Sequence, residues 1–402
     1  MRVLLLSHLY PSPSNTVNGS FVHSQVKALI NQGCQVTVVT PTPWAPFPLN
    51  KLSKKWQKYS QIPKHATLDG VEIIYPRIIR TPGAKFFQYA GQIYYHALKN
   101  LISSLHKKES FDLIHAQVGY PDGYAASKLA KNLNLPLVIT CHGQELQIIV
   151  NKSPKLKELT INSLKSADRV IVTGPKLHRL AAQHNLTNLT IIPNGLEKQS
   201  QIDKQTAVKA ESQANSQTPN LSQPKPYTIL SVANLIEQKG IQHVIQALKE
   251  ATMDFSYLVV GDGPCMSTLQ TLAQEQGLAD KVLFAGQIPH SQIYDWYSKA
   301  DLFIMPSRDE AFGMVYLEAM QAGLPIIGCL GEGIMPEIQE AKAGIAVPFN
   351  DPESIKAAIE TINAIPSEYK QNALHLAAKY SWENNAQTQI KVYREVSTNH
   401  ED

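Results

Sequence analysis

Short apolar runs alternate with helical patterns along this chain, and this alternation restricts the fold more than any other feature. In the first half the runs lie at residues 2–7, 35–39, 71–75, 112–115, 136–140, 168–172 and 189–192. In the second half they lie at residues 228–233, 257–260, 282–284, 301–305, 325–328 and 345–347. Strands that alternate with helices build parallel sheets with helices on both faces. The sequence therefore predicts an α/β protein with two doubly wound, Rossmann-like domains that face each other across a cleft.

Composition predicts where the two domains meet. Residues 198–226 are rich in Gln, Ser, Asn and Thr and hold almost no large apolar side chains, so they are expected to form a flexible linker. The N-terminal domain is then expected at 1–197 and the C-terminal domain at 227–379. A last helical pattern, which includes Trp382, lies in residues 380–402.

The overall composition is that of an ordinary globular protein, with 402 residues, 43% apolar and 17% charged. No apolar run is long enough to cross a membrane, and the first one is too short for a signal peptide. The cysteines are scattered without metal-ligand spacing, which favours a reducing, cytoplasmic compartment. Cys141 precedes His142 at a strand end, where neighbours point to opposite faces, so we expect a buried thiol and an exposed imidazole.

Basic residues are concentrated near the N-terminus. In residues 1–108, 13 lysines and arginines stand against 2 acidic residues, which predicts an anionic partner. Aromatic residues such as Trp44, Phe47 and Trp56 lie among the lysines, a combination that suits the anionic inner face of the cytoplasmic membrane. The alternative is a solvated basic face with the aromatic rings packed inward. Nucleic-acid binding is not expected, because no aromatic recognition motif accompanies the charge.

Two glutamates flank a predicted helix start in the second domain. Glu310 follows an apolar strand and is expected on a loop, whereas Glu318 is expected inside the next helix. The first residues of that helix are predicted to be Phe312, Gly313, Met314 and Val315. Their free N–H groups and the helix dipole favour an anion such as a diphosphate. A carboxylate on each side of this helix start would suit the hydroxyl groups of a sugar nucleotide, although a bare pair of acids could equally be a solvated helix face.

The residues around these glutamates form a longer motif. The segment from Pro306 to Met320, continued by Gly-x-Pro-Ile-Ile-Gly at 323–328, resembles the retaining glycosyltransferases of family 4, which carry a Glu-x7-Glu signature in this context. The resemblance covers nearly the whole chain and implies the GT-B fold, with a final helix that crosses back to the first domain. It also implies an acceptor-side first domain and a second domain that binds the nucleotide sugar. Members that build envelope polysaccharides, such as the teichuronic acid glycosyltransferases, are the most similar.

The resemblance also implies which residues hold the donor. Lys239 matches a family lysine that binds the diphosphate, and Glu318 and Glu310 match the family's two acids. Asn234 stands where the family often has an arginine, and Arg308 is expected to supply the missing charge. Ile288 follows a strand at the place where the family binds the nucleobase.

In the first domain the resemblance singles out two motifs. Gly19 lies in a loop ahead of the first helix, where the backbone would approach a phosphate or sugar. Cys141-His142-Gly143-Gln144-Glu145 matches the family's His-Gly-x-Asp motif, with Glu145 in place of Asp. The resemblance implies that His142 contacts the transferred sugar. His142, Glu310 and Lys239 are therefore the expected catalytic residues.

The expected reaction is transfer of a sugar from a UDP- or GDP-type sugar nucleotide to a glycan or lipid-linked acceptor, with retention of the anomeric configuration. No Asp-x-Asp occurs in the sequence, so neither a metal nor another cofactor is expected. Two alternatives remain open at this stage. One is a sugar-nucleotide epimerase of the same architecture, and the other is a non-catalytic carbohydrate-binding protein.

Overall fold

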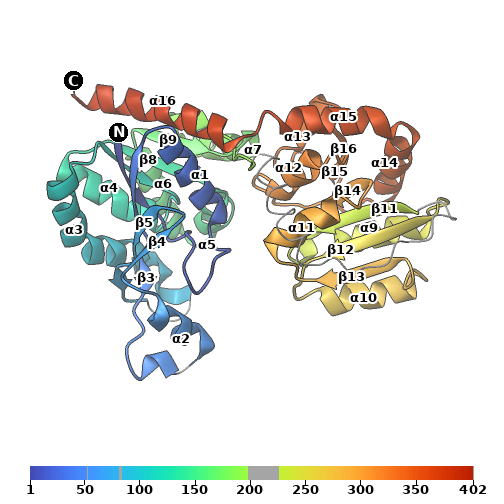
Figure 1. Ribbon diagram of the computed structural model, residues 1–402, viewed down its shortest axis with the longest axis horizontal. Helices are drawn as coiled ribbons and strands as arrows, with labels where there is room; N and C mark the ends of the chain where they lie inside the picture. The colour runs from blue at the N-terminus through green and yellow to red at the C-terminus, as the bar shows by residue number, and fades with distance from the viewer. Residues whose placement is uncertain (52, 81–83, 198–225, 402) are drawn as a thin grey trace. The chain divides into compact units, whose positions relative to one another are not determined.

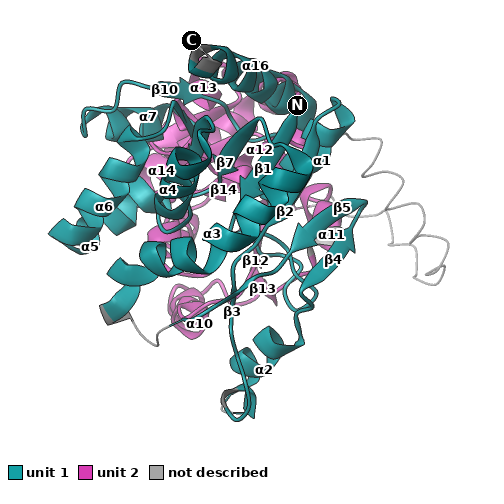
Figure 2. Ribbon diagram, turned by 90° about the vertical axis from the view of Figure 1, so that its left-hand side faces the viewer, with its two compact units in different colours: residues 1–195, 382–402 teal, residues 196–381 magenta. Residues whose placement is uncertain are grey.

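The computed structural model describes residues 1–51, 53–80, 84–197 and 226–401. The chain divides into two compact units (Figure 2). Unit 1 comprises Met1–Gly195 and Trp382–Asp402, and unit 2 comprises Leu196–Ser381. The linker expected at 198–226 lies, except for its last residue, outside the described residues.

Unit 1 is built on an eight-stranded sheet with the strand order β10-β9-β8-β7-β1-β2-β5-β4. In chain order, the strands are β1 (Arg2–Leu6), β2 (Gln35–Val39), β4 (His65–Leu68), β5 (Val71–Ile74), β7 (Leu113–Ala116), β8 (Leu137–Cys141), β9 (Arg169–Val172) and β10 (Leu189–Ile191). All neighbours pair in parallel except β4 and β5, which are antiparallel. Two short strands, β3 (Thr42–Pro43) and β6 (Arg77–Ile78), pair separately.

Helices connect these strands. They are α1 (Ser20–Asn31), α2 (Lys54–Gln61), α3 (Ala90–Glu109), α4 (Asp122–Leu133), α5 (Val150–Lys152), α6 (Pro154–Lys165) and α7 (Pro175–Ala182). Shorter turns are η1 (Leu49–Lys51), η2 (Ala84–Tyr89) and a π-helical turn, η3 (Glu145–Ile149). The last helix, α16 (Trp382–Glu401), belongs to unit 1 and packs against α1, as expected for the crossing helix (Figure 1).

Unit 2 is a six-stranded parallel sheet with the order β13-β12-β11-β14-β15-β16. Its strands are β11 (Tyr227–Val232), β12 (Phe255–Val260), β13 (Val282–Gly286), β14 (Leu302–Met305), β15 (Ile326–Cys329) and β16 (Gly344–Val347). Its helices are η4 (Glu237–Lys239), α9 (Ile241–Lys249), α10 (Met266–Glu275), α11 (His290–Tyr297), α12 (Met314–Gln321), α13 (Met335–Glu340), α14 (Pro352–Ala364) and α15 (Pro366–Ala377).

In each unit the sheet supplies the centre of the core. β1 and β14 are fully buried apart from the exposed Arg2, because a central parallel strand is covered by helices on both faces. Two apolar clusters in unit 2 lie on opposite faces of its sheet, since Phe303 belongs to one cluster and its neighbour Ile304 to the other. Both units are therefore α/β layers of the expected doubly wound type. No helix in the described part of the chain is long and apolar enough to span a bilayer.

Candidate functional site

Lys239 and Glu310 form an ion pair in unit 2. The Lys239 ammonium lies 2.7 Å from Glu310 Oε2, and the two side chains are only 22% and 16% exposed. Lys239 ends η4, which follows β11, and Glu310 lies on the loop after β14. β11 and β14 are neighbours in the sheet, so their carboxyl ends bring the two loops together. The structure thus joins two residues that the resemblance assigned separately, Lys239 as the family's diphosphate-binding lysine and Glu310 as one of its two acids.

The loop that carries Glu310 is fixed by its own backbone. The Glu310 N–H donates to Glu332 Oε2 at 2.7 Å, and the Glu310 carbonyl accepts from the Gly333 N–H at 3.1 Å. Gly333 has a φ of 49°, and a Cβ there would lie 2.4 Å from the Phe312 carbonyl oxygen. Only glycine fits at this close approach. Glu332 and Gly333 hold the Glu310 loop, and the sequence had not singled them out for this purpose.

The helix after Glu310 begins later than predicted. α12 starts at Met314, so Met314 and Val315 are in its first turn, whereas Phe312 and Gly313 precede it. The prediction that all four are helical was wrong because Gly313 adopts a φ of 92°, outside the helical region. The Phe312 side chain is buried in the core and would offer a ligand only backbone groups. The free N–H groups expected at the helix start are therefore those at the beginning of α12.

Glu318 lies in the second turn of α12 and accepts a hydrogen bond from the Tyr297 hydroxyl at 2.8 Å. Tyr297 is fully buried, and burial together with the Glu318 charge raises the pKa of its hydroxyl well above the ordinary value. Tyr297 is therefore a permanent donor, and it orients the Glu318 carboxylate. No sequence motif had pointed to Tyr297.

The other donor-side candidates surround the Lys239 loop. The Arg308 N–H donates to the Gln238 carbonyl at 2.9 Å, which places Arg308 beside the segment that carries Lys239. The Arg308 guanidinium stacks over the Phe349 ring at 4.8 Å and lies 3.7 Å from Glu237. Asn234 is exposed on the same segment. The second cation expected in this region is therefore present, although Glu237 offsets part of its charge.

Ile288 follows β13 and is half-buried against the core of unit 2. It contributes apolar surface at the carboxyl end of this edge strand.

His142 and Glu145 form a compact motif at the end of β8 in unit 1. Glu145 is fully buried, and its carboxylate accepts hydrogen bonds from three backbone N–H groups, those of Gly119, His142 and Gly143. Burial raises the Glu145 pKa, although these hydrogen bonds oppose the shift. Glu145 therefore shapes the loop that presents His142. The His142 ring lies edge-on to Phe21 at 4.9 Å.

Cys141 is fully buried, as expected, and burial raises its pKa well above the ordinary value. A protonated, inaccessible thiol is not a nucleophile. His142 is half-buried and therefore less exposed than predicted.

Gly19 caps the start of α1 with a φ of 68°. A Cβ at this position would lie 2.3 Å from the Leu9 carbonyl group, so the loop after β1 touches the helix start here. The glycine is therefore required by the backbone itself, whether or not a ligand approaches it.

One pair in unit 1 was missed from the sequence. His8 Nδ1 lies 2.8 Å from Asp122 Oδ2, and the His8 N–H donates to the same oxygen at 3.0 Å. Burial would lower the His8 pKa, but the charge and hydrogen bond of the buried Asp122 outweigh it and raise the value. His8 follows β1, and Asp122 begins α4 shortly after β7. β1 and β7 are neighbouring parallel strands, and polar residues that follow such strands meet at one edge of the sheet. A search for polar residues after each predicted strand could therefore have found the pair.

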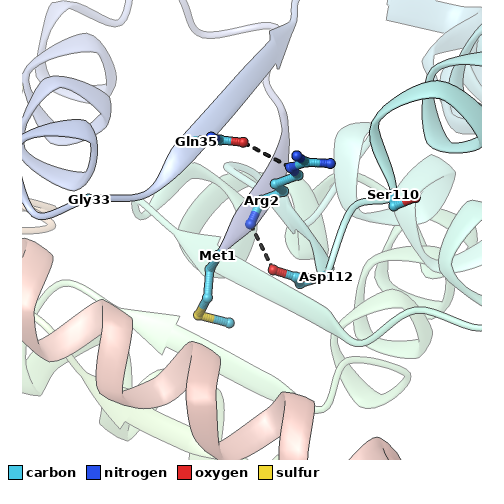
Figure 3. Close-up of a pocket in the computed structure, with 6 residues that line it drawn as sticks. All are labelled: Met1, Arg2, Gly33, Gln35, Ser110 and Asp112. Carbon is cyan, nitrogen blue, oxygen red and sulfur yellow. Dashed lines mark hydrogen bonds between the residues drawn. The ribbon is translucent and has the colours of Figure 1, made fainter.

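The hollow in Figure 3 lies at the opposite edge of the unit 1 sheet. It is lined by Met1, Arg2, Gly33, Gln35, Ser110 and Asp112, which lie at or before the amino ends of β1, β2 and β7. The Arg2 N–H donates to Asp112 at 2.7 Å, and the Arg2 side chain donates to Gln35 at 2.8 Å. These polar groups satisfy one another. Ligands of open α/β sheets bind at the carboxyl ends, so the hollow is not the candidate site.

The described residues hold no group of three or more His, Cys, Asp or Glu side chains that could bind a metal ion. The expectation of a metal-free reaction stays a prediction.

Two family models match separate parts of this chain. The model of glycosyltransferase family 4 matches residues 19–199, and the model of glycosyl transferases group 1 matches residues 212–379. TuaC of Bacillus subtilis, a glycosyltransferase assigned to teichuronic acid biosynthesis, is 27% identical over 329 residues, which are 81% of this chain and 80% of that protein.

Solved structures resemble the whole chain. Sucrose-phosphate synthase from Thermosynechococcus elongatus has a TM-score of 0.75 at 21% identity, covering 98% of this chain and 99% of that one. HepE of Anabaena, solved in complex with UDP-glucose, has a TM-score of 0.66 at 16% identity, covering 98% of this chain and 100% of that one. At these identities the likeness establishes a shared fold.

Proposed function

Because this chain is a glycosyltransferase of the group 1 and family 4 type with the GT-B fold, we propose that it transfers a sugar from a nucleotide diphosphate sugar to a glycan or lipid-linked acceptor. We further propose that the anomeric configuration is retained. UDP-glucose bound to HepE, which shares the fold, supports a nucleotide-sugar donor. The similarity to TuaC supports an acceptor in envelope polysaccharide synthesis.

The observation that carries the proposal is the Lys239–Glu310 pair, next to the loop that leads into α12. A lysine ammonium has three N–H donors, so Lys239 can keep its bond to Glu310 and still donate to a diphosphate. The first N–H groups of α12 would bind the same diphosphate, and Arg308 would add a second positive charge. These groups would stabilise the charge that develops on the leaving diphosphate, so no metal is needed.

The carboxylates would orient the rest of the donor. Glu310, held by Lys239 and by its backbone bonds, would accept hydrogen bonds from the transferred sugar. Glu318, oriented by Tyr297, would accept hydrogen bonds from the ribose hydroxyls. The exposed Asn234 could donate to a diphosphate oxygen, and Ile288 would cover the nucleobase. In unit 1, His142 would contact the transferred sugar, and Gly19 would let the backbone approach it.

The acceptor is proposed to reach the enzyme at an anionic membrane surface. In unit 1, α2 has no buried residue, and the side chains of Phe47 and Trp44 are 73% and 53% exposed. Exposed aromatic rings near Lys54, Lys55 and Lys58 support contact with lipid head groups. Such contact would place the protein at the inner face of the cytoplasmic membrane without spanning it.

Product analysis tests the proposal directly. The purified protein is incubated with a panel of UDP- and GDP-sugars and lipid-linked acceptors, and nucleoside diphosphate release is measured. We expect release with one donor class only when an acceptor is present, and an NMR spectrum of the product with the donor's anomeric configuration. An inverted product would refute retention. Release of an isomerised sugar nucleotide without transfer would refute the transferase proposal.

A further inference from the structure

A chain of buried polar side chains in unit 1 connects His142 to the C-terminal helix α16. Its members come from α1, β7, the segment after β7, β8 and α16, and each is at most 4% exposed. They are Gln25, His115, Gln117, Thr140, Asn385, Gln389 and Tyr393. Buried polar groups at this density are unusual in a core, and none of these residues has a part in the proposed transfer.

A backbone carbonyl fixes which groups donate and which accept in this series of hydrogen bonds. Asn385 Nδ2 donates to the Pro193 carbonyl at 2.7 Å, and a carbonyl oxygen can only accept. Asn385 Oδ1 therefore faces the other way, toward Gln25 Nε2 at 3.3 Å and Gln389 Nε2 at 2.6 Å. Both glutamine side chains must donate to it, so the orientation of their amides is fixed as well.

The same donor and acceptor roles continue along the hydrogen bonds from Gln25 to His142. Because Gln25 donates to Asn385, its Oε1 is the acceptor for Gln117 Nε2 at 2.7 Å. Gln117 Oε1 is then left to face His142 Nε2 at 2.9 Å, and this oxygen can only accept. His142 Nε2 must carry a hydrogen atom. In a neutral imidazole the other nitrogen, Nδ1, then carries a lone pair.

His142 is neutral, since burial lowers its pKa to about 3. Its Nδ1 is buried and has no hydrogen-bond partner among the described residues. A buried acceptor without a donor is costly, unless a ligand supplies the donor. A sugar hydroxyl group has the required chemistry.

A second branch of hydrogen bonds runs from Asn385 to Thr140 on β8, the strand that ends just before His142. Gln389 Oε1 accepts from the Tyr393 hydroxyl at 2.9 Å, so the Tyr393 oxygen must accept from His115 Nδ1 at 2.7 Å. His115 Nε2 then accepts from the Thr140 hydroxyl at 2.8 Å. Thr140 lies on β8, two residues before His142. Both branches start from Asn385 on α16.

We propose that α16 positions His142, by fixing it as the Nε2–H tautomer so that its Nδ1 accepts a hydrogen bond from a hydroxyl group of the transferred sugar. Asn385 is the positioning residue in this arrangement, and it acts through Gln25 and Gln117 without touching the substrate. The role of His142 in sugar binding rests on the proposed function, whereas the tautomer depends only on unit 1.

The tautomer is measured by nitrogen NMR of the full-length protein labelled at histidine, with the His142 signals assigned from His142→Gln. At neutral pH the wild type should show one protonated Nε2 and one unprotonated Nδ1. Asn385→Leu frees both glutamine amides to rotate, so the His142 signals should shift toward an average of the two tautomers. Gln387→Leu, an exposed change on the same helix, is the matched control.

Kinetics then tests the consequence. In Asn385→Leu, kcat should fall by about twofold while KM for the donor changes little, because an equal mixture of the two tautomers leaves about half of the molecules with an acceptor at His142 Nδ1. Asn385→Asp keeps the acceptor for Gln25 and Gln389 and, as the neutral acid that burial favours, can still donate to the Pro193 carbonyl, so it should show the wild-type spectrum.

Wild-type His142 in the Nδ1–H form would overturn the inference, even if no Asn385 variant folds. An unchanged spectrum in Asn385→Leu would also overturn it. A fixed tautomer in a protein that transfers no sugar would instead count against the proposed function alone.

Discussion

At the scale of single residues, Glu310 is held from two sides, by the Lys239 ammonium and by backbone bonds to Glu332 and Gly333. Glu310→Gln keeps the shape of the side chain and removes its charge. We expect turnover to fall about ten- to a hundredfold, because a hydrogen bond to a charged group contributes about 1.5–3 kcal/mol. Nucleotide affinity should change less, whereas Glu318→Ala should mainly weaken nucleotide binding. Steady-state kinetics and calorimetry with UDP and GDP measure the two effects.

Glu340→Gln is the control for both substitutions, since Glu340 is an exposed glutamate of unit 2. Near-normal transfer by both the Glu310 and Glu318 variants would show that these glutamates do not form the donor site.

His115 predicts a pH dependence of stability. It is fully buried, and burial lowers its pKa to about 3 from an ordinary value of 6.5. Between these values the unfolded chain binds a proton that the folded chain does not, so stability falls as the pH drops below about 6.5. At pH 5 this one histidine should lower the free energy of unfolding by about 2 kcal/mol relative to pH 8. Denaturant unfolding at the two pH values measures the difference.

His115→Gln should reduce that pH difference by the same amount, whatever its effect on stability at pH 8. His96→Gln, at an exposed position, should leave the difference unchanged. Equal pH differences in the wild type and His115→Gln would show that this group does not titrate on unfolding.

The sequence could single out the two carboxylates of the candidate site but not the residues that contact them. Glu310 and Glu318 were found because both lie in one continuous motif. Lys239 and Glu310 are 71 residues apart, and their contact depends on β11 and β14 being neighbours in the sheet. Strand order is not visible in local apolar patterns, and for the same reason the His8–Asp122 pair was missed.

At the scale of elements, every predicted strand is present, because most of these strands are short, largely buried and mostly apolar runs. β4 was not predicted. It lies at the edge of the sheet, and its side chains are exposed or half-buried, so its sequence carries little apolar signal. The start of α12 was misplaced because the conformation of Gly313 depends on its surroundings, which the sequence does not reveal.

α2 is the element on which the membrane proposal depends. Replacement of Lys54, Lys55 and Lys58 by glutamate should abolish binding to anionic vesicles at low salt, since each lysine near such a surface contributes about 1 kcal/mol. Co-sedimentation measures binding, and high salt should release the wild type.

The matched control replaces Lys131, Lys157 and Lys165 by glutamate, which changes the net charge equally at exposed positions of the same unit. Equal loss of binding in both triple variants would indicate attraction to the overall charge. A wild type that fails to sediment with anionic vesicles at low salt would disprove membrane docking and leave the transferase proposal intact.

The start of α12 leads to a prediction about metals. Because this helix start and Lys239 are proposed to bind the leaving diphosphate, transfer should continue in excess EDTA at an unchanged rate. A manganese-dependent glycosyltransferase in the same buffer serves as the control for chelation. Loss of activity that manganese or magnesium restores would refute the proposed stabilisation of the leaving group.

At the scale of the whole molecule, the two units differ in how the chain builds them. Unit 2 is one continuous segment, Leu196–Ser381, with its own sheet and core clusters. Expressed alone, it should fold and bind UDP or GDP within about tenfold of the affinity of the full chain, but should transfer no sugar. Calorimetry measures the binding, and Glu318→Ala in the isolated unit should weaken it. An isolated unit that folds but binds no nucleotide would show that the donor site is incomplete without unit 1.

The return of α16 to unit 1 imposes an order on biosynthesis. A ribosome makes the first 195 residues of unit 1 long before α16. Gln25 and His115 therefore lack their partners Asn385 and Tyr393 while unit 2 is synthesised and can already fold. Synthesis of unit 1 therefore begins before that of unit 2 but is completed after it. A chain truncated before α16 would contain all of unit 2, but its His142 would lack the contacts through Asn385 that are proposed to hold it in place. Under the proposed function, such a product would bind nucleotide sugar without transferring it, so α16 would make transfer depend on synthesis of both units.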